Sequence, residues 1–160
     1  MTTTPDDKAM TAALTAIQTK TTALGTTVST WKGLLPDALP ITTTSANLLT
    51  QIKHATTTAQ ATSTPFTFSD ALAVAVATGR LSAVVQTTLR IIIDNKPRFD
   101  KLLILSPVVL LNLEGLRRAT TELSAAVVRR LPGDLGRVAG VLVRGIDEAF
   151  GGAIDVYRMF

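Results

Sequence analysis

The chain has 160 residues and a formal net charge of +4, with 46% hydrophobic residues but only 4% aromatic ones. A chain of this length is typical of one domain that buries roughly 70% of its unfolded surface. Its core must be built mainly from Leu, Ile, Val and Ala, and the absence of cysteine excludes disulfides, thiolate metal sites and thiol catalysis. We therefore expect a single domain over residues 1–160.

Charge and hydroxyl groups are unevenly distributed. Up to Asp70 the lysines and aspartates balance, so the net charge of +4 belongs to the arginine-rich remainder, whereas most threonines precede Ser69. No secretory signal is present, and Met1 followed by Thr-Thr-Thr-Pro is typical of an expression start placed on a mature N-terminus. Because the helical pattern continues across both halves, we expect one domain with two different faces.

The first two helices are indicated by apolar residues at alternating intervals of three and four. The first is expected from about Asp6 to Lys32, and the following segment GLLPDALP indicates a loop. The second helix should begin near Thr43 or Thr44 and stop before Pro65. Their expected inward positions are Met10, Leu14, Ile17, Thr21, Leu24, Val28 and Trp31, followed by Ser45, Leu48, Ile52, Ala55 and Ala59.

Between Leu81 and Leu113, two apolar segments are separated by Lys96-Pro97-Arg98. Because proline lacks an N–H and disfavours the α conformation of the residue before it, the third helix should end near Asn95 or Lys96. We expect a tight connection over Lys96–Asp100, with Ser106 as the N-cap of the fourth helix. The apolar run over 102–113 is too short to span a bilayer, which takes ~20 residues.

The remaining pattern completes a helical fold. Thr67 or Ser69 is expected to cap the third helix, and the turn at 131–133 precedes a fifth helix capped by Asp134. The expected inward positions are Leu72, Val76, Gly79, Ala83, Leu89 and Ile92, then Val109, Leu113, Leu116, Thr120, Leu123 and Val127, then Leu135, Val138, Leu142, Ile146, Phe150, Ala153, Ile154 and Tyr157. We predict an all-α, antiparallel five-helix bundle.

Residues that carry chemistry are few. His54 is the only histidine, and without a second ligand or a nucleophile beside it we expect a surface or boundary residue. The doublets Arg117-Arg118 and Arg129-Arg130 are compatible with an anionic partner, but solvated helix faces explain them equally well. The low aromatic content also argues against base stacking. We therefore expect no enzyme, no metal, no cofactor and no nucleic-acid partner.

Small residues lie on or beside the inward stripes. They either allow close helix–helix packing or leave an apolar cavity along the bundle axis, and periodicity does not separate these alternatives. A helix of about 25 residues is ~37 Å long, longer than an extended long-chain fatty acid. Burial of about fifteen methylenes there would contribute roughly 12 kcal/mol before ordering and association costs. The small residues are Ala13, Ala55, Ala59, Gly79, Ala83, Gly145, Ala149 and Ala153.

Four stretches, in order, resemble the fungal hydrophobic surface-binding protein and cell-wall galactomannoprotein family. They are GLLPDALPI at Gly33–Ile41, ANLLTQIKHATTTAQATS in the second helix, NKPRFD at Asn95–Asp100 and IDEAFGGAIDVY at Ile146–Tyr157. The resemblance implies a small secreted or wall-attached helical mannoprotein. Some members bind fatty acids in a long apolar cavity, and others adsorb to hydrophobic surfaces and recruit hydrolases. It transfers no reactive residue to this chain.

These observations together predict a secreted lipid-binding protein that sequesters a long-chain fatty acid in an apolar cavity between helices. Candidates for contact with the carboxylate are the hydroxyls of Thr21, Ser45 and Thr120, which serve helix carbonyls equally well. The alternative is an interaction protein with a packed core, whose apolar segments Ile91–Ile93 and Leu102–Leu105 coat hydrophobic surfaces. The expected acyl-chain contacts are Leu14, Ile17, Leu48, Ile52, Val76, Leu89, Leu116, Leu123 and Ile146.

Overall fold

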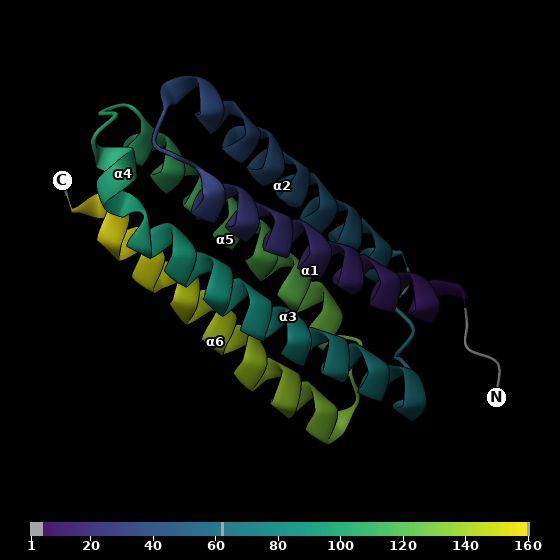
Figure 1. Ribbon diagram of the computed structural model, residues 1–160. Coiled ribbons are helices and arrows are strands. Elements are labelled where there is room, and N and C mark those ends of the chain that lie inside the picture. The colour runs from purple at the N-terminus through teal and green to yellow at the C-terminus, as the bar shows by residue number, and fades with distance from the viewer. Residues whose placement is uncertain (1–4, 62, 160) are drawn as a thin grey trace.

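The structure, a computed structural model, describes residues 5–61 and 63–159, and all regular secondary structure in these ranges is helical (Figure 1). The predicted all-α class is confirmed. Two short elements join the long helices: the 3-10 helix η1 (Leu35–Ala38) and α4 (Lys96–Asp100). The long helices are α1 (Pro5–Thr30), α2 (Leu39–Gln60), α3 (Phe68–Asp94), α5 (Leu105–Val128) and α6 (Gly133–Arg158).

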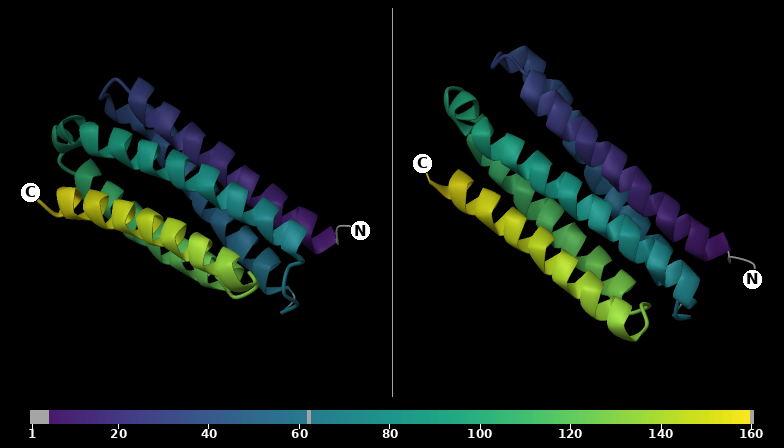
Figure 2. Two further views of the ribbon diagram at one scale, coloured as in Figure 1. Left: turned by 90° about the horizontal axis from the view of Figure 1, so that it is seen from below. Right: turned by 60° about the horizontal axis from the view of Figure 1, so that its bottom comes forward.

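The five long helices of the described ranges form a closed ring in the order α1, α2, α5, α6, α3. Helices that follow one another in the chain run in opposite directions, as expected (Figures 1 and 2). Because five is an odd number, neighbours in the ring cannot alternate throughout. The pairs α2–α5, α3–α6 and α1–α3 are parallel neighbours. The inward faces of all five helices meet along the axis of this ring, and the core lies there.

Two helices begin at residues other than those predicted. α2 begins at Leu39, so Pro40 lies in its first turn rather than in a loop. Proline suits that position because its φ is fixed near the helical value and its missing N–H would have no partner there. α5 begins at Leu105, and Ser106 does not cap it. The Ser106 hydroxyl donates instead to Asp100 Oδ1 at 2.5 Å, which ties the start of α5 to α4.

The predicted break between the third and fourth helices is confirmed, but the connection is itself helical. α3 ends at Asp94, and Pro97 occupies the first turn of α4. Lys96 Nζ forms an ion pair with Asp100 Oδ2 at 2.8 Å across that turn. The chain therefore passes from α3 to α5 through one helical turn and residues 101–104 rather than through a single tight turn.

The caps of α3 and α6 differ in how well they were predicted. Thr67 caps α3: its Oγ1 accepts from the Asp70 N–H at 3.3 Å and donates to Asp70 Oδ2 at 2.7 Å. Asp134 does not cap α6. It lies in the first turn, and the N-cap position is Pro132, which has no side-chain hydrogen bond. An acidic residue in a first turn still interacts favourably with the positive end of the helix dipole.

The buried face of α3 differs from the predicted one. Leu72 and Val76 are 47% and 49% exposed, so both predictions of an inward position are wrong, as they are for the exposed Ala83 and, on α6, Val138. α3 lies between α1 and α6, and the early part of the predicted stripe, Leu72, Val76 and Ala83, falls on the remaining solvent face. The buried residues of α3 are Ala71, Val74, Ala75, Thr78, Leu81, Ser82, Val85, Thr88, Leu89 and Ile92.

Within the described residues, α3 is also the one helix whose length and apolar composition would allow it to span a membrane. Packing against α1 and α6 explains part of that composition, since 39% of its most apolar window is buried, whereas Leu72 and Val76 are exposed.

Aromatic side chains close the end of the bundle next to α4. Trp31 stacks on Phe99 with ring centroids 4.7 Å apart, and Tyr157 meets Phe99 edge-on at 6.3 Å. The Tyr157 hydroxyl donates to the backbone carbonyl of Ile92 at 2.5 Å. Burial, together with the negative charge of Asp100, raises the pKa of this phenol. This end of the core is therefore filled by large, hydrogen-bonded side chains.

Arg130 closes the opposite end. It does not lie on a solvated helix face, one of the two explanations of the arginine doublets, because it is only 4% exposed. Its Nε donates to the carbonyl of Thr64 at 2.9 Å, and its guanidinium lies 4.0 Å from the centroid of the Phe66 ring. The backbone N–H of Phe66 donates in return to the Arg130 carbonyl at 2.9 Å. These contacts hold the α2–α3 connection against the end of α5.

Candidate functional site

A small cavity of about 30 Å³ lies on the axis of the ring, where all five long helices contribute side chains. Its walls are aliphatic except for three threonines and one phenylalanine. The lining residues are Ile17, Thr21, Leu24, Leu48, Ile52, Leu81, Val85, Thr88, Leu89, Ile92, Leu116, Thr120, Ile146 and Phe150. We call this space the central cavity.

A second cavity of about 30 Å³ lies toward the α4 end. It shares Leu24, Ile92 and Leu116 with the central cavity, so the two follow one another along the bundle axis. Its polar residues are Ser45 from α2 and Asn112 from α5, and we call it the α2–α5 cavity. Its remaining lining residues are Val28, Ile41, Phe99, Val109 and Leu113.

The volumes show how closely the core is packed. Each cavity has roughly a tenth of the volume at the lower end of the range for small-molecule pockets, which is about 300–1,000 Å³. A long acyl chain fits along this axis only if aliphatic side chains rotate or helices move apart. The small inward residues thus produce close helix packing in this structure, and the cavities mark where that packing is least complete.

The three predicted head-group hydroxyls differ in what they already bind. Thr21 Oγ1 donates to the Ile17 carbonyl and Thr120 Oγ1 to the Leu116 carbonyl, each at 2.7 Å. Such bonds to the preceding helical turn leave these hydroxyls without a free proton.

Ser45 is different. It is 6% exposed, and among the described residues neither its hydroxyl nor the side-chain amide of Asn112 has a hydrogen-bond partner. A carboxylate requires donors, and Ser45 and Asn112 supply them at one cavity.

The structure brings most of the predicted lining together. Leu14 and Leu123 are buried on the same helices beyond the central cavity, whereas Val76 points to solvent, so its assignment to an interior wall is wrong. Sequence reasoning missed Asn112, whose signal was an amide within the apolar run over 102–113. The predicted residues that line the central cavity are Ile17, Thr21, Leu48, Ile52, Leu89, Leu116, Thr120 and Ile146.

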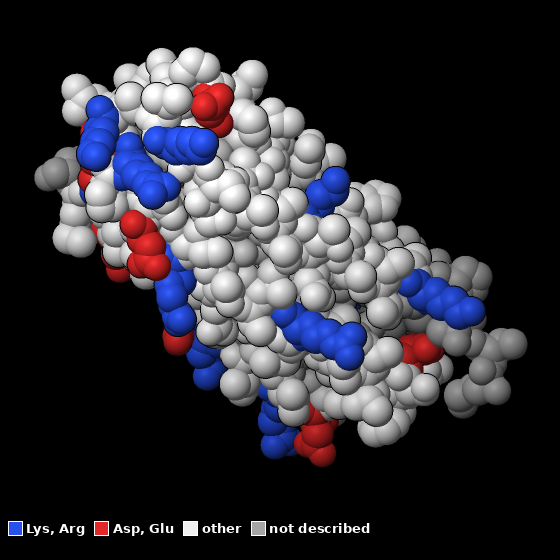
Figure 3. All heavy atoms as spheres, viewed as in Figure 1, with Lys and Arg blue, Asp and Glu red and all other residues white. Residues whose placement is uncertain are grey.

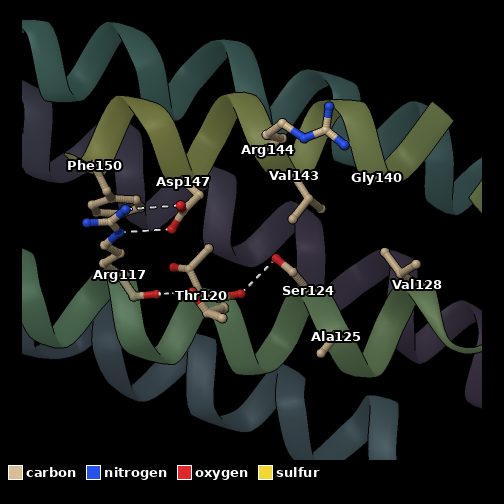
Figure 4. Close-up of a pocket in the computed structure, with 11 residues that line it drawn as sticks. Arg117, Thr120, Ser124, Ala125, Val128, Gly140, Val143, Arg144, Asp147 and Phe150 are labelled. Carbon is tan, nitrogen blue, oxygen red and sulfur yellow. Dashed lines mark hydrogen bonds and ion pairs between the residues drawn. The ribbon is translucent and has the colours of Figure 1, made fainter. Parts of the chain in front are cut away.

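A larger groove, of about 460 Å³, lies between α5 and α6 (Figure 4). Thr120 and Phe150 line both this groove and the central cavity, so they stand between the two spaces. Val143 points into the groove from α6, opposite Ser124 on α5 (Figure 4). We call this space the α5–α6 groove.

One ion pair dominates the electrostatics of the groove. Arg117 Nε contacts Asp147 Oδ1 at 2.9 Å, and Arg117 Nη2 contacts Asp147 Oδ2 at 3.0 Å, a bidentate arrangement (Figure 4). The hydrogen bonds from Arg117 lower the pKa of the Asp147 carboxyl, which therefore stays ionised near neutral pH. Arg144 extends along α6, away from this pair (Figure 4). No described residue pairs with Arg144.

Other polar chemistry is sparse. His54 is exposed, and no group of three His, Cys, Asp or Glu residues suitable for a metal ion occurs within the described ranges. On the face shown in Figure 3, charged side chains gather near the α4 end and along the α6 edge, leaving a broad uncharged area between them. The free neutral donors described above lie in the interior, and the α5–α6 groove is one of several surface grooves with room for a ligand.

Comparisons with known proteins agree with this geometry. AfMP4p in complex with palmitic acid superimposes with a TM-score of 0.90 at 26% identity, covering 94% of this chain and 99% of that one. Ligand-binding domain 1 of Penicillium marneffei MP1, complexed with arachidonic acids, gives 0.88 at 17% identity, covering 95% and 98%. Domain 2 of the same protein, complexed with multiple arachidonic acids, gives 0.88 at 20% identity and 96% of both chains. The two MP1 domains show the shared fold.

No curated protein sequence matches this chain. Residues 8–129, which include α2, α3 and α5 and nearly all of α1, match the family described as hydrophobic surface binding protein A. Because that match covers well over half of the sequence, this chain belongs to the hydrophobic surface binding protein A family.

Proposed function

We propose that this chain is a non-enzymatic, secreted or wall-attached fungal protein that binds a long-chain fatty acid along the axis of its five-helix ring. The observation that carries the proposal is the pair of unpartnered donors, Ser45 and Asn112, at one end of an aliphatic axis. The likeness to the palmitic acid complex of AfMP4p supports the same ligand class.

The acyl chain supplies the affinity in this proposal. It runs from the α2–α5 cavity past Leu116 into the central cavity, where Leu48, Ile52, Leu89 and Ile146 surround it. Each buried methylene contributes roughly 0.8 kcal/mol. The interior has to open to admit the chain, and that reorganisation offsets part of the gain. Aliphatic side chains are suited to this because they change rotamer without losing a hydrogen bond.

The carboxylate is held by neutral donors. Ser45 Oγ–H and the Asn112 amide each have a proton to donate, whereas Thr21 and Thr120 have committed theirs to helix carbonyls. Asn112 is only partly buried, so water can reach the same carboxylate. A few polar groups of this kind fix the orientation of a ligand in a mostly apolar pocket.

Thermal unfolding of delipidated protein with added palmitate tests the proposal. A ligand that binds only the folded state stabilises it by about 2.7 kcal/mol at a hundredfold excess over Kd. The melting temperature should therefore rise with palmitate concentration, and native mass spectrometry should detect the complex. An unchanged melt, together with failure to displace a fluorescent acyl probe, would refute fatty-acid binding.

Two variants test the head-group assignment. The double change Ser45→Ala and Asn112→Leu should weaken palmitate binding at least about tenfold, because hydrogen bonds to a charged group contribute ~1.5–3 kcal/mol each. Thr43→Ala, at an exposed position of the same helix, is the matched control and should bind as the wild type does. Equal affinity in both variants would place the carboxylate elsewhere.

A second candidate function is adsorption to hydrophobic surfaces, favoured by the apolar side chains at the α4 end. Leu103 and Ile104 are 87% and 65% exposed, and Leu34, Leu35 and Leu39 are exposed in and beside η1 at the same end of the bundle (Figure 1). The predicted adsorbing face included the segment Ile91–Ile93, but Ile92 of that segment is buried. Changing Leu103 and Ile104 together to Ser should abolish retention on alkyl-coated beads without altering palmitate affinity. Unchanged retention would contradict this candidate.

A further inference from the structure

The wall between the central cavity and the α5–α6 groove consists of two side chains. Phe150 is almost fully buried, and it lines both spaces together with Thr120. Phe150 is also the one aromatic residue among the described residues that line the central cavity. A bulky, rigid ring therefore stands where the aliphatic axis would otherwise continue into a preformed groove of about 460 Å³.

The groove continues the same line along α5. Asn112, Leu116, Thr120, Ser124 and Val128 recur at intervals of four, and successive members line the α2–α5 cavity, the central cavity and the groove. Each step of four residues stays adjacent on the helix surface but turns about 40° around it, so over sixteen residues, about 24 Å, the series winds from the α2 side of α5 to its α6 side. A chain anchored at Asn112 and running along α5 therefore reaches Phe150 and then the groove.

Most polar groups of the groove, all except Arg144, already have a hydrogen-bond partner among the described residues. Thr120 Oγ1 donates to the Leu116 carbonyl and Ser124 Oγ to the Thr120 carbonyl, both at 2.7 Å. Arg117 and Asp147 bind one another. With Ala125, Val128 and Val143, these groups form walls that an apolar ligand end can cover without breaking a hydrogen bond.

We propose that the α5–α6 groove receives the methyl end of acyl chains too long for the interior, and that Phe150 determines the chain length at which this happens. The proposal rests on the proposed fatty-acid function. Next to Phe150 a carboxylate is the less suitable occupant, because Arg117 is bidentate to Asp147 and the ionised Asp147 repels a second anion. Arg144, which has no partner among the described residues, also lines the groove, but it extends along α6 away from this pair (Figure 4). Short chains end before Phe150, whereas longer chains displace its ring.

Gly140→Trp is the test, because it fills the far part of the groove without touching the interior. A Cβ at Gly140 meets nothing within 4 Å, and the helical backbone there accepts any residue. Gly152→Trp is the matched control: it also lies on α6, its Cβ also meets open space, and it lines no part of the groove. Competition with a fluorescent acyl probe gives affinities for decanoate, laurate, palmitate, stearate and arachidate.

Gly140→Trp should match the wild type for decanoate and laurate but lose about tenfold or more in affinity for arachidate. Gly152→Trp should match the wild type for every chain. Equal weakening of all chains by Gly140→Trp would place the carboxylate in the groove and overturn the proposal, and so would no weakening of any chain. If the wild type binds none of these acids, the proposed function itself fails.

Phe150→Leu provides a second measurement with the opposite sign. The smaller side chain opens the passage to the groove, so affinity for arachidate should rise relative to laurate. A melting curve of the unliganded variant shows whether it folds, since shortening a buried aromatic side chain removes packing contacts. An unchanged ratio of arachidate to laurate affinity in the folded variant would overturn the assignment of Phe150.

Discussion

Arg130 should be one of the most stabilising polar residues of this protein, although its neighbour Arg129 is exposed and looks identical in the sequence. Arg130→Ala removes the Nε bond to the Thr64 carbonyl at 2.9 Å and the contact with the Phe66 ring at 4.0 Å. A hydrogen bond from a charged donor contributes ~1.5–3 kcal/mol. A desolvated cation–π contact contributes about 2 kcal/mol.

These contributions, with the lost packing of the arginine stem, give an expected destabilisation of about 3–5 kcal/mol. For a chain of this length, each kcal/mol lowers the melting temperature by ~2–4 °C. Arg130→Ala should therefore melt at least about 6 °C below the wild type. Urea unfolding followed by helical circular dichroism measures the free energy directly.

Arg129→Ala is the control, because exposed substitutions usually stay within about 0.5 kcal/mol of the wild type. The comparison has a definite failure condition. If the free energy of unfolding of Arg130→Ala is within about 1 kcal/mol of that of Arg129→Ala, the desolvation cost of the buried guanidinium cancels the stabilisation from its contacts. The contacts between the α2–α3 connection and the end of α5 would then not be stabilising.

Three further predictions follow from single contacts. Tyr157→Phe should cost about 1–3 kcal/mol in urea unfolding, because it strips a buried carbonyl of its donor. The Arg117 bond depresses the pKa of Asp147 below 3.8, so its stabilisation is complete above that value and is lost as pH falls through the lower, folded-state pKa. The stability difference between wild type and Asp147→Asn should therefore disappear in an acid titration below about pH 4. Val76→Ser should change neither stability nor palmitate affinity, whereas Val74→Ala, at a fully buried site, should cost about 1–3 kcal/mol in the same unfolding assay.

Several features of this protein were predictable because they depend on neighbours in the chain. The alternating three-four spacing of Leu14, Ile17, Thr21 and Leu24 is a local property of a helix, and so is the break before Pro97. The aliphatic interior follows from composition, since a chain with few aromatics has little else with which to fill a core. The family could also be predicted from the sequence, because each of the four stretches that carry the resemblance is contiguous in the chain.

The arrangement of the ring decided the rest. Val76 and Val74 are both valines of α3, yet the first is exposed and the second is buried, because α1 and α6 together cover the opposite part of the helix. Arg129 and Arg130 diverge in the same way, according to which of them meets the α2–α3 connection. A helical pattern gives the angle between residues on one helix, but it does not contain the directions in which the neighbouring helices lie.

The candidate site depends most strongly on that arrangement. Ser45 and Asn112 lie on helices separated by α3 and α4 in the chain, and they line one cavity because α2 and α5 are neighbours in the ring. Phe150 meets Thr120 for the equivalent reason on the α6 side. The sequence determined which residues are apolar and which helices carry them. Only the packing of helices distant in sequence decided which donors lack a partner, because hydrogen bonds and cavities belong to pairs of surfaces rather than to any one helix.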